Sequence, residues 1–226
     1  MPHAVKRAVV LLSGGLDSAT CLWWAKSRGY VPTALSVRYG QRHAKELGSA
    51  RRLARRAGAA LHEAALGLPW LKTSSLVDRK KVLPELPLSK IGVGGVPSTY
   101  VPGRNTMFVA LGLSLADAIG AEAVVVGANA LDYSGYPDCR PAFYAAFGKV
   151  ARLGTARGAS GRRLAVLAPL VKLDKAAIVR LARRLKVPLE LTWSCYAGGR
   201  RPCGRCDSCK LRAKGFAVAG APDPAL

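Results

Sequence analysis

Strand-like and helix-like stretches alternate along this chain, and this alternation constrains the fold more than any other feature of the sequence. Five short apolar runs predict buried strands, at residues 8–12, 32–37, 60–65, 123–126 and 164–168. The stretches between and after them predict helices, at residues 17–27, 43–57, 105–119, 141–153 and 174–185, the last of these being the last long helix. Strands that alternate with helices are typical of a parallel sheet with right-handed crossovers, so we expect an α/β fold.

The size and composition of the chain narrow the class of protein. With 226 residues, it is long enough for one α/β domain with a small appendage. Half of the residues are apolar, which argues against intrinsic disorder. No uninterrupted apolar run approaches the roughly 18 residues that a membrane-spanning helix needs. The first residues lead into a strand without the pattern of a secretory signal, so we expect a cytoplasmic protein that does not bind membranes.

The formal net charge of +22, from 35 Lys and Arg against 13 Asp and Glu, is unusual for a metabolic enzyme. It indicates either a polyanionic partner, with nucleic acid the first candidate, or basic residues on solvated helix faces. The second interpretation is favoured because basic and apolar residues alternate at helical spacing in "SARRLARRAG" and "IVRLARRLK". We therefore do not expect direct tRNA binding, although the positive field would still attract a nucleotide.

A glycine-rich turn, "SGGLDS" at residues 13–18, follows the first predicted strand. Glycines at this place let the backbone turn tightly and direct N–H groups at an anion near the start of the next helix. Ser13 and Ser18 add hydroxyl groups, and Asp17 is a candidate ligand for magnesium. The structural alternative is a simple turn in which Asp17 or Ser18 caps the helix.

The turn lacks the lysine of a Walker loop, but the complete string resembles the PP-loop of the ATP pyrophosphatase families. That resemblance implies a grip on the β- and γ-phosphates of ATP as one leaving group. The residues expected to contact ATP are Leu12, Ser13, Gly14, Gly15, Leu16, Asp17 and Ser18.

Four cysteines near the C-terminus have the spacing C-x7-C-x2-C-x2-C. Four thiolates at this spacing can close a tetrahedral site, for which zinc is the default metal. An iron–sulfur cluster uses the same ligands and stays open as an alternative, whereas disulfides do not suit a cytoplasmic chain. The expected ligands are Cys195, Cys203, Cys206 and Cys209.

A polar loop at residues 127–144 follows the fourth predicted strand. Its aromatic, amide, carboxylate and arginine side chains are suited to a planar heterocycle with donor and acceptor edges, although a polar turn without function remains the alternative. Two cations elsewhere, Arg104 before a helix and Lys175 in the first turn of another, are candidates for pairing with phosphate or carboxylate. Residues 66–102 are rich in Pro, Gly and Ser and are expected to form a long excursion that serves as a lid or binding loop. The loop residues expected to bind substrate are Asn129, Asp132, Tyr133, Tyr136, Asp138 and Arg140.

Six stretches occur in an order that resembles the QueC family of 7-cyano-7-deazaguanine synthases, over roughly residues 8–216: "SGGLDS", "YGQRH", "YVPGRN", "LDYSGYPDCR", "KLDKAAIV" and "SCY…PCGRCDSC". The resemblance implies an adenine nucleotide alpha-hydrolase-like fold, which is a Rossmann-like three-layer sandwich, with a small C-terminal zinc-binding segment. The expected division is a catalytic domain at residues 1–190 and a four-cysteine segment at 191–226. One structural zinc ion per chain and a homodimer are also implied.

The activity implied by the resemblance is a carbon–nitrogen ligase that converts 7-carboxy-7-deazaguanine and ammonia to the 7-cyano compound with ATP and magnesium. A carboxylate is a poor acyl donor, so we expect an adenylated carboxylate and then an amide intermediate. Catalysis by positioning and charge stabilisation is expected because no serine–histidine–aspartate set stands out. The alternative is a PP-loop enzyme that thiolates tRNA, and the end product, queuosine or archaeosine, stays open. The residues expected to take part in catalysis are Ser13, Asp17, Arg104 and Lys175.

Overall fold

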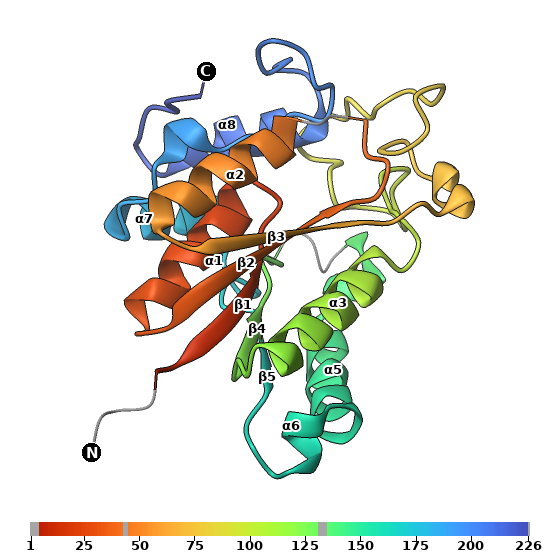
Figure 1. Ribbon diagram of the computed structural model, residues 1–226. Helices are drawn as coiled ribbons and strands as arrows, with labels where there is room; N and C mark the ends of the chain where they lie inside the picture. Colours follow the sequence, from red (N-terminus) through yellow and green to blue (C-terminus); the bar gives the residue numbers. More distant parts are fainter. Residues whose placement is uncertain (1–4, 43–44, 131–134, 226) are drawn as a thin grey trace.

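The computed structural model describes residues 5–42, 45–130 and 135–225, and its centre is a sheet of five parallel strands. The strand order is β3-β2-β1-β4-β5, so the chain starts in the middle of the sheet and builds outward in both directions (Figure 1). Every strand end lies within one residue of its predicted position, which confirms the α/β prediction. The strands are β1 (Arg7–Leu11), β2 (Val31–Arg38), β3 (Ala60–Ala65), β4 (Ala123–Val125) and β5 (Ala165–Leu167).

Helices cover both faces of the sheet, which gives the expected three-layer sandwich (Figure 1). The helices on one face are α1 (Leu16–Ser27), α2 (Lys45–Ala57), α7 (Lys175–Arg184) and α8 (Asp207–Val218). Those on the other are α3 (Arg104–Ala118), α5 (Pro141–Gly154) and α6 (Ala156–Ala159). No helix in the described part of the chain is long and apolar enough to cross a membrane.

Two separate hydrophobic cores lie on the two faces of the sheet, and alternating side chains of the strands pack into one or the other. Val10 of β1 belongs to the core beneath α1, α2 and α7, while its neighbour Val9 belongs to the core beneath α3 and α5. Successive strand residues point to opposite faces, so a central strand covered on both sides must be apolar at every position. This requirement explains why the central strands read as continuous apolar runs, whereas the edge strand β3 contains His62 and Glu63 and is largely exposed.

Two helices were missed. The prediction that 174–185 is the last long helix was wrong, because the 12-residue helix α8 follows it. The buried residues of α8 are Cys209, Arg212, Gly215 and Phe216, so its inward face lacks the apolar repeat that reveals most helices. The short basic stretch "ARGASGRRLA", which its composition predicts to be a loop, also contains the short helix α6, which is capped by the Thr155 hydroxyl accepting from the Gly158 N–H.

The long excursion at 66–102 is confirmed as largely irregular, with one 3-10 turn, η1 (Pro69–Thr73). It is anchored by a small apolar cluster that contains Tyr39, Leu71 and Leu76. Its role as a lid remains a prediction.

Candidate functional site

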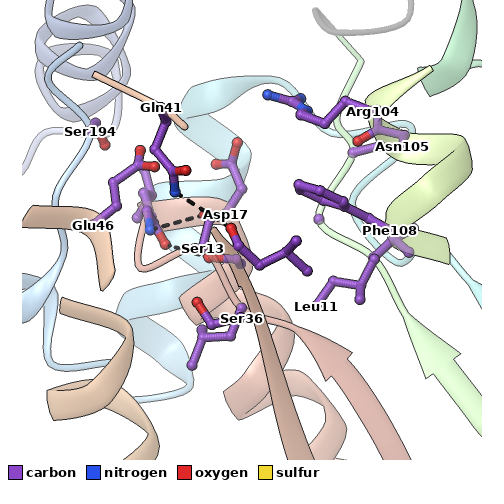
Figure 2. Close-up of a pocket in the computed structure, with 18 of the residues that line it drawn as sticks. Leu11, Ser13, Asp17, Ser36, Gln41, Glu46, Arg104, Asn105, Phe108 and Ser194 are labelled. Carbon is purple, nitrogen blue, oxygen red and sulfur yellow. Dashed lines mark hydrogen bonds between the residues drawn. The ribbon is translucent and has the colours of Figure 1, made fainter. Parts of the chain in front are cut away.

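A cavity opens at the carboxyl ends of β1, β2 and β4, and Figure 2 shows its lining. β1 lies between β2 and β4, whose connections leave it in opposite directions across the sheet. Open α/β sheets bind ligands at such a topological switch point. The cavity therefore lies where the strand order alone would place a binding site.

The glycine-rich turn forms one wall of this cavity. The Ser13 and Ser18 hydroxyls lie 3.1 Å apart, and the Gly15 N–H donates to the Ser13 hydroxyl at 3.3 Å. Gly14 has a φ of +97°, and a Cβ on it would overlap the Glu46 carbonyl oxygen of α2. A glycine is therefore required where the turn packs against α2.

Asp17 joins three segments that are distant in the sequence. Its carboxylate accepts from Lys175 Nζ at 3.0 and 2.7 Å and from Asn129 Nδ2 at 2.9 Å. The side chains of Asp17 and Lys175 are each 20 % exposed, so the ion pair is largely shielded from water. A carboxylate offers about four lone-pair sites, and three are used here, which leaves capacity for a cation. One carboxylate with nucleotide phosphates is a common magnesium site, so the residues fit that ion.

Arg104 faces the turn from the other side of the cavity (Figure 2). Burial alone would lower the pKa of its guanidinium, but Tyr39, Cys139 and Tyr136 raise that pKa overall. Burial raises the pKa of the Tyr39 hydroxyl, and the charge of Arg104 opposes this effect. The cavity thus contains a permanent positive charge that can hold an anionic group.

The four cysteines form a compact cluster beside the cavity. Their sulfur atoms all lie within 4.8 Å of one another, with 4.0 Å between the sulfurs of Cys203 and Cys209. A tetrahedral zinc ion with bonds of about 2.3 Å requires sulfur atoms roughly 3.8 Å apart, so the cluster fits one such ion. A hydrogen bond from Cys209 lowers the pKa of the Cys206 thiol to about 5, which favours the thiolate that a metal requires. Cys21, outside the cluster, is buried in the core and donates to the Val126 carbonyl at 3.4 Å.

The family profile described as "Queuosine biosynthesis protein QueC" matches residues 7–220. The chain belongs to this family. It is 53 % identical over 223 residues to the 7-cyano-7-deazaguanine synthase of Anaeromyxobacter sp. (strain Fw109-5), with 98 % of this chain and 96 % of that protein covered. The corresponding synthase of Dechloromonas aromatica (strain RCB) is 48 % identical over 225 residues, with 98 % of each covered.

The structure of NMN synthetase from Francisella tularensis resembles this QueC-family chain in fold, with a TM-score of 0.52 and 17 % identity. The match covers 97 % of this chain and 79 % of the NMN synthetase. At this identity the likeness concerns the fold alone.

The structure brings together most of the residues expected to bind ATP or take part in catalysis. The cavity lining includes Leu12, Ser13, Gly15, Leu16, Asp17, Ser18, Arg104 and Lys175. Gly14 lies behind the turn against α2. The roles expected of these residues remain predictions.

The polar loop of this QueC-family chain lends Gly127, Ala128, Cys139 and Tyr144 to the cavity lining, whereas the expected substrate ligands Tyr136, Asp138 and Arg140 are not part of it. The Asp138 carboxylate accepts from the backbone N–H of Asn105 at 3.0 Å, near the start of α3, and Tyr136 shares a hydrogen bond of 2.7 Å with Thr99. Arg140 is exposed at the start of α5. Asn129 reaches the site through Asp17. Asp132 and Tyr133 lie outside the described residues, and substrate binding by this loop remains a prediction.

Several cavity residues were not found from the sequence. Ser36 lies near the carboxyl end of β2, and its hydroxyl is the one buried side-chain N or O atom without a hydrogen-bond partner in the described ranges 5–42, 45–130 and 135–225. Gln41 lies in "YGQRH", a stretch that carried the family resemblance but was given no role. Ser194 and Ser208 lie within "SCY…PCGRCDSC", of which only the cysteines were given a role, whereas Glu46 and Arg212 lie outside the quoted motifs.

Proposed function

We propose that this chain is a 7-cyano-7-deazaguanine synthase, which converts 7-carboxy-7-deazaguanine and ammonia to the nitrile with ATP, in queuosine biosynthesis. The observation that carries the proposal is near-full-length identity of about half to synthases of that name, in a chain whose glycine-rich turn and Arg104 line one cavity. Family membership disfavours the tRNA-thiolating alternative.

The glycine-rich turn would hold the β- and γ-phosphates, and the arrangement of Asp17 and Lys175 suits attack at the α-phosphate. A carboxylate oxygen of the substrate attacks the α-phosphorus, the bond to pyrophosphate breaks, and an acyl adenylate forms. Lys175, which pairs with Asp17 at 2.7 Å, is placed to offset the negative charge that grows on the phosphates. Magnesium, when bound, would neutralise charge on the pyrophosphate as it departs.

Arg104 would hold the carboxylate of the deazaguanine opposite the turn. Its charge and its position across the cavity from Ser13 and Asp17 support this role. Ammonia then attacks the acyl carbon, and AMP leaves with one of the original carboxylate oxygens. The same geometry serves the amide: its oxygen attacks the α-phosphorus of a second ATP, pyrophosphate leaves, and loss of AMP with two N–H protons then gives the nitrile.

The four cysteines would hold one zinc ion with a structural role, because all four positions of a tetrahedral ion are filled by protein. We also propose that the enzyme is a cytoplasmic homodimer, as the resemblance to its family implies.

The test is incubation of the purified chain with ATP, magnesium, ammonium and the acid labelled with heavy oxygen in its carboxylate. We expect nitrile, AMP that carries the label, and a transient 7-amido compound, all measured by mass spectrometry. Absence of nitrile would refute the function. Label in inorganic phosphate, with ADP as the nucleotide product, would keep the function but move the attack to the γ-phosphate.

A further inference from the structure

Residues 192–196, which we call the strap, cross the glycine-rich turn between η3 (Leu189–Leu191) and the cysteine cluster. The backbone N–H of Trp193 donates to the Gly14 carbonyl at 2.9 Å. A Cβ on Gly15 would lie 3.5 Å from the Trp193 carbonyl oxygen, so the two segments are in contact. The turn is therefore held between α2 on one side and the strap on the other.

This hydrogen bond orients the group that would meet a phosphate. The Gly14 carbonyl and the Gly15 N–H belong to one planar trans peptide, in which the C=O and N–H bonds point in opposite directions. The hydrogen bond that orients the Gly14 carbonyl therefore also orients the Gly15 N–H. The Gly15 N–H lies on the phosphate-binding turn and now donates to Ser13. A glycine pair has little conformational preference of its own, so its ordering must come from neighbours such as Trp193.

Trp193 is tied to the metal cluster at one end of the strap. Its Nε1–H donates to the carbonyl of Cys195, a cluster residue, at 2.9 Å. Lys45 of α2 places its Nζ 4.6 Å from the Trp193 ring centroid and also donates to the Arg200 carbonyl, within the loop that links two of the cysteines. The position of the Trp193 indole is thus set by a hydrogen bond to the cluster residue Cys195 and by the contact with Lys45 of α2.

A buried ion pair anchors the other side. Arg212 of α8 donates to the Thr192 hydroxyl at 2.8 Å and the Ser194 hydroxyl at 3.2 Å, and it forms two hydrogen bonds of 2.6 and 2.9 Å with Asp223. The side chains of Arg212 and Asp223 are 7 % and 4 % exposed. Figure 2 places Ser194 beside Glu46 and Gln41, across the cavity from Arg104.

We propose that Trp193 is a positioning residue for the phosphate-binding turn, and that the cysteine cluster and the Arg212–Asp223 pair set nucleotide affinity by holding the strap in place. The C-terminal segment thereby acts on ATP binding in addition to its part in the fold. The inference rests on the proposed function, since it assumes that the turn binds ATP.

Three variants test it, with binding of magnesium and α,β-methylene-ATP measured by calorimetry. Asp223→Asn removes the charge that orients Arg212, Lys45→Met removes the cation over the indole, and Trp193→Phe removes the bond to Cys195. Each should raise the Kd for the analogue about three- to tenfold, the range expected for one net hydrogen bond. The KM for 7-carboxy-7-deazaguanine should change less than twofold, which a general loss of folding would not produce.

Glu63→Gln is the matched control, because it breaks another two-bond arginine–carboxylate pair, with Arg51, on the exposed surface. It should leave both constants unchanged. Wild-type protein stripped of metal by a chelator, and shown to stay folded by circular dichroism, should bind the analogue more weakly as well. If Asp223→Asn does not fold, the other two variants decide the outcome.

A wild-type Kd in Lys45→Met and Trp193→Phe would overturn the proposal. If instead the unmodified protein fails to bind the analogue or make the nitrile, the proposed function itself is wrong. The two failures are therefore distinguishable.

Discussion

At the scale of single residues, Asp17 connects the most distant segments of the site, because its carboxylate accepts hydrogen bonds from both Lys175 and Asn129. Asp17→Asn keeps the shape and removes the charge, so we expect turnover to fall by about a hundredfold or more. The melting temperature should change little, because the asparagine carbonyl oxygen can still accept a hydrogen bond from Lys175 Nζ. Product formation by mass spectrometry and a thermal melt measure the two effects.

The control for this variant is Asp174→Ala, one residue before Lys175. Its carboxylate caps α7 by accepting from the Ala177 N–H at 2.7 Å, so its loss should cost about 1 kcal/mol of stability. Turnover should survive. Equal turnover in Asp17→Asn and the wild type would remove Asp17 from the mechanism.

Ser36 gives the second prediction at this scale. A buried hydroxyl without a partner costs free energy that a bound ligand can recover. Ser36→Ala should therefore leave the unliganded protein as stable as before, or more so, while it raises the KM for ATP or for the acid. Ser49→Ala is the control, because that buried hydroxyl already accepts from Arg52 at 3.1 Å. Unchanged KM values with a lower melting temperature would show that Ser36 only serves the fold.

The sequence could supply Ser13, Asp17, Arg104 and Lys175 as separate candidates, because each stands in or beside a recognisable motif. It could not supply Ser36, since a lone serine at the end of an apolar strand has no pattern around it. What makes this residue unusual is the missing partner, which only three-dimensional packing reveals.

At the scale of elements, the contact between the turn and α2 makes two adjacent glycines unequal. Gly14→Ala puts a Cβ onto the Glu46 carbonyl at a positive φ, so the turn or the helix must shift. We expect a lower melting temperature and loss of nucleotide binding. Gly15→Ala places its Cβ at ordinary contact distance, 3.5 Å from its nearest neighbours, and should be much milder. Thermal melts and calorimetry on both variants compare them, and equal effects would contradict the packing argument.

Elements whose burial is regular were predictable, and those buried irregularly were not. The strands and α1, α3, α5 and α7 were found within one residue of their ends. α5 and α7 have apolar faces that repeat at helical spacing, whereas α1 and α3 are apolar over most of their length. α8 instead buries Arg212 and a metal-cluster cysteine, so its pattern resembles a polar loop. α8, which carries the anchor Arg212, therefore gave little local signal, whereas α2, which carries Lys45, was predicted.

At the scale of the whole molecule, the cysteine cluster and the main core share α8. Phe216 of α8 packs into the core beneath α1 and α7, while Cys209 of the same helix faces the cluster. Cys209→Ser should therefore lower metal content and melting temperature together. Cys21→Ala is the control: it removes a buried thiol outside the cluster and should keep the metal.

Elemental analysis of both variants should show about one zinc per chain in Cys21→Ala and less in Cys209→Ser. If the wild type instead contains iron and absorbs visible light, the four cysteines hold an iron–sulfur cluster and the zinc assignment is wrong.

The hydrogen bond between Trp193 and Gly14 also has a consequence for folding during synthesis on the ribosome. A ribosome releases the glycine-rich turn early and the strap about 180 residues later, at roughly 5–20 residues per second. During that interval of several seconds or more, the emerging sheet can form while the turn still lacks one of its walls. A growing chain should therefore acquire its full affinity for ATP only after the strap has left the ribosome.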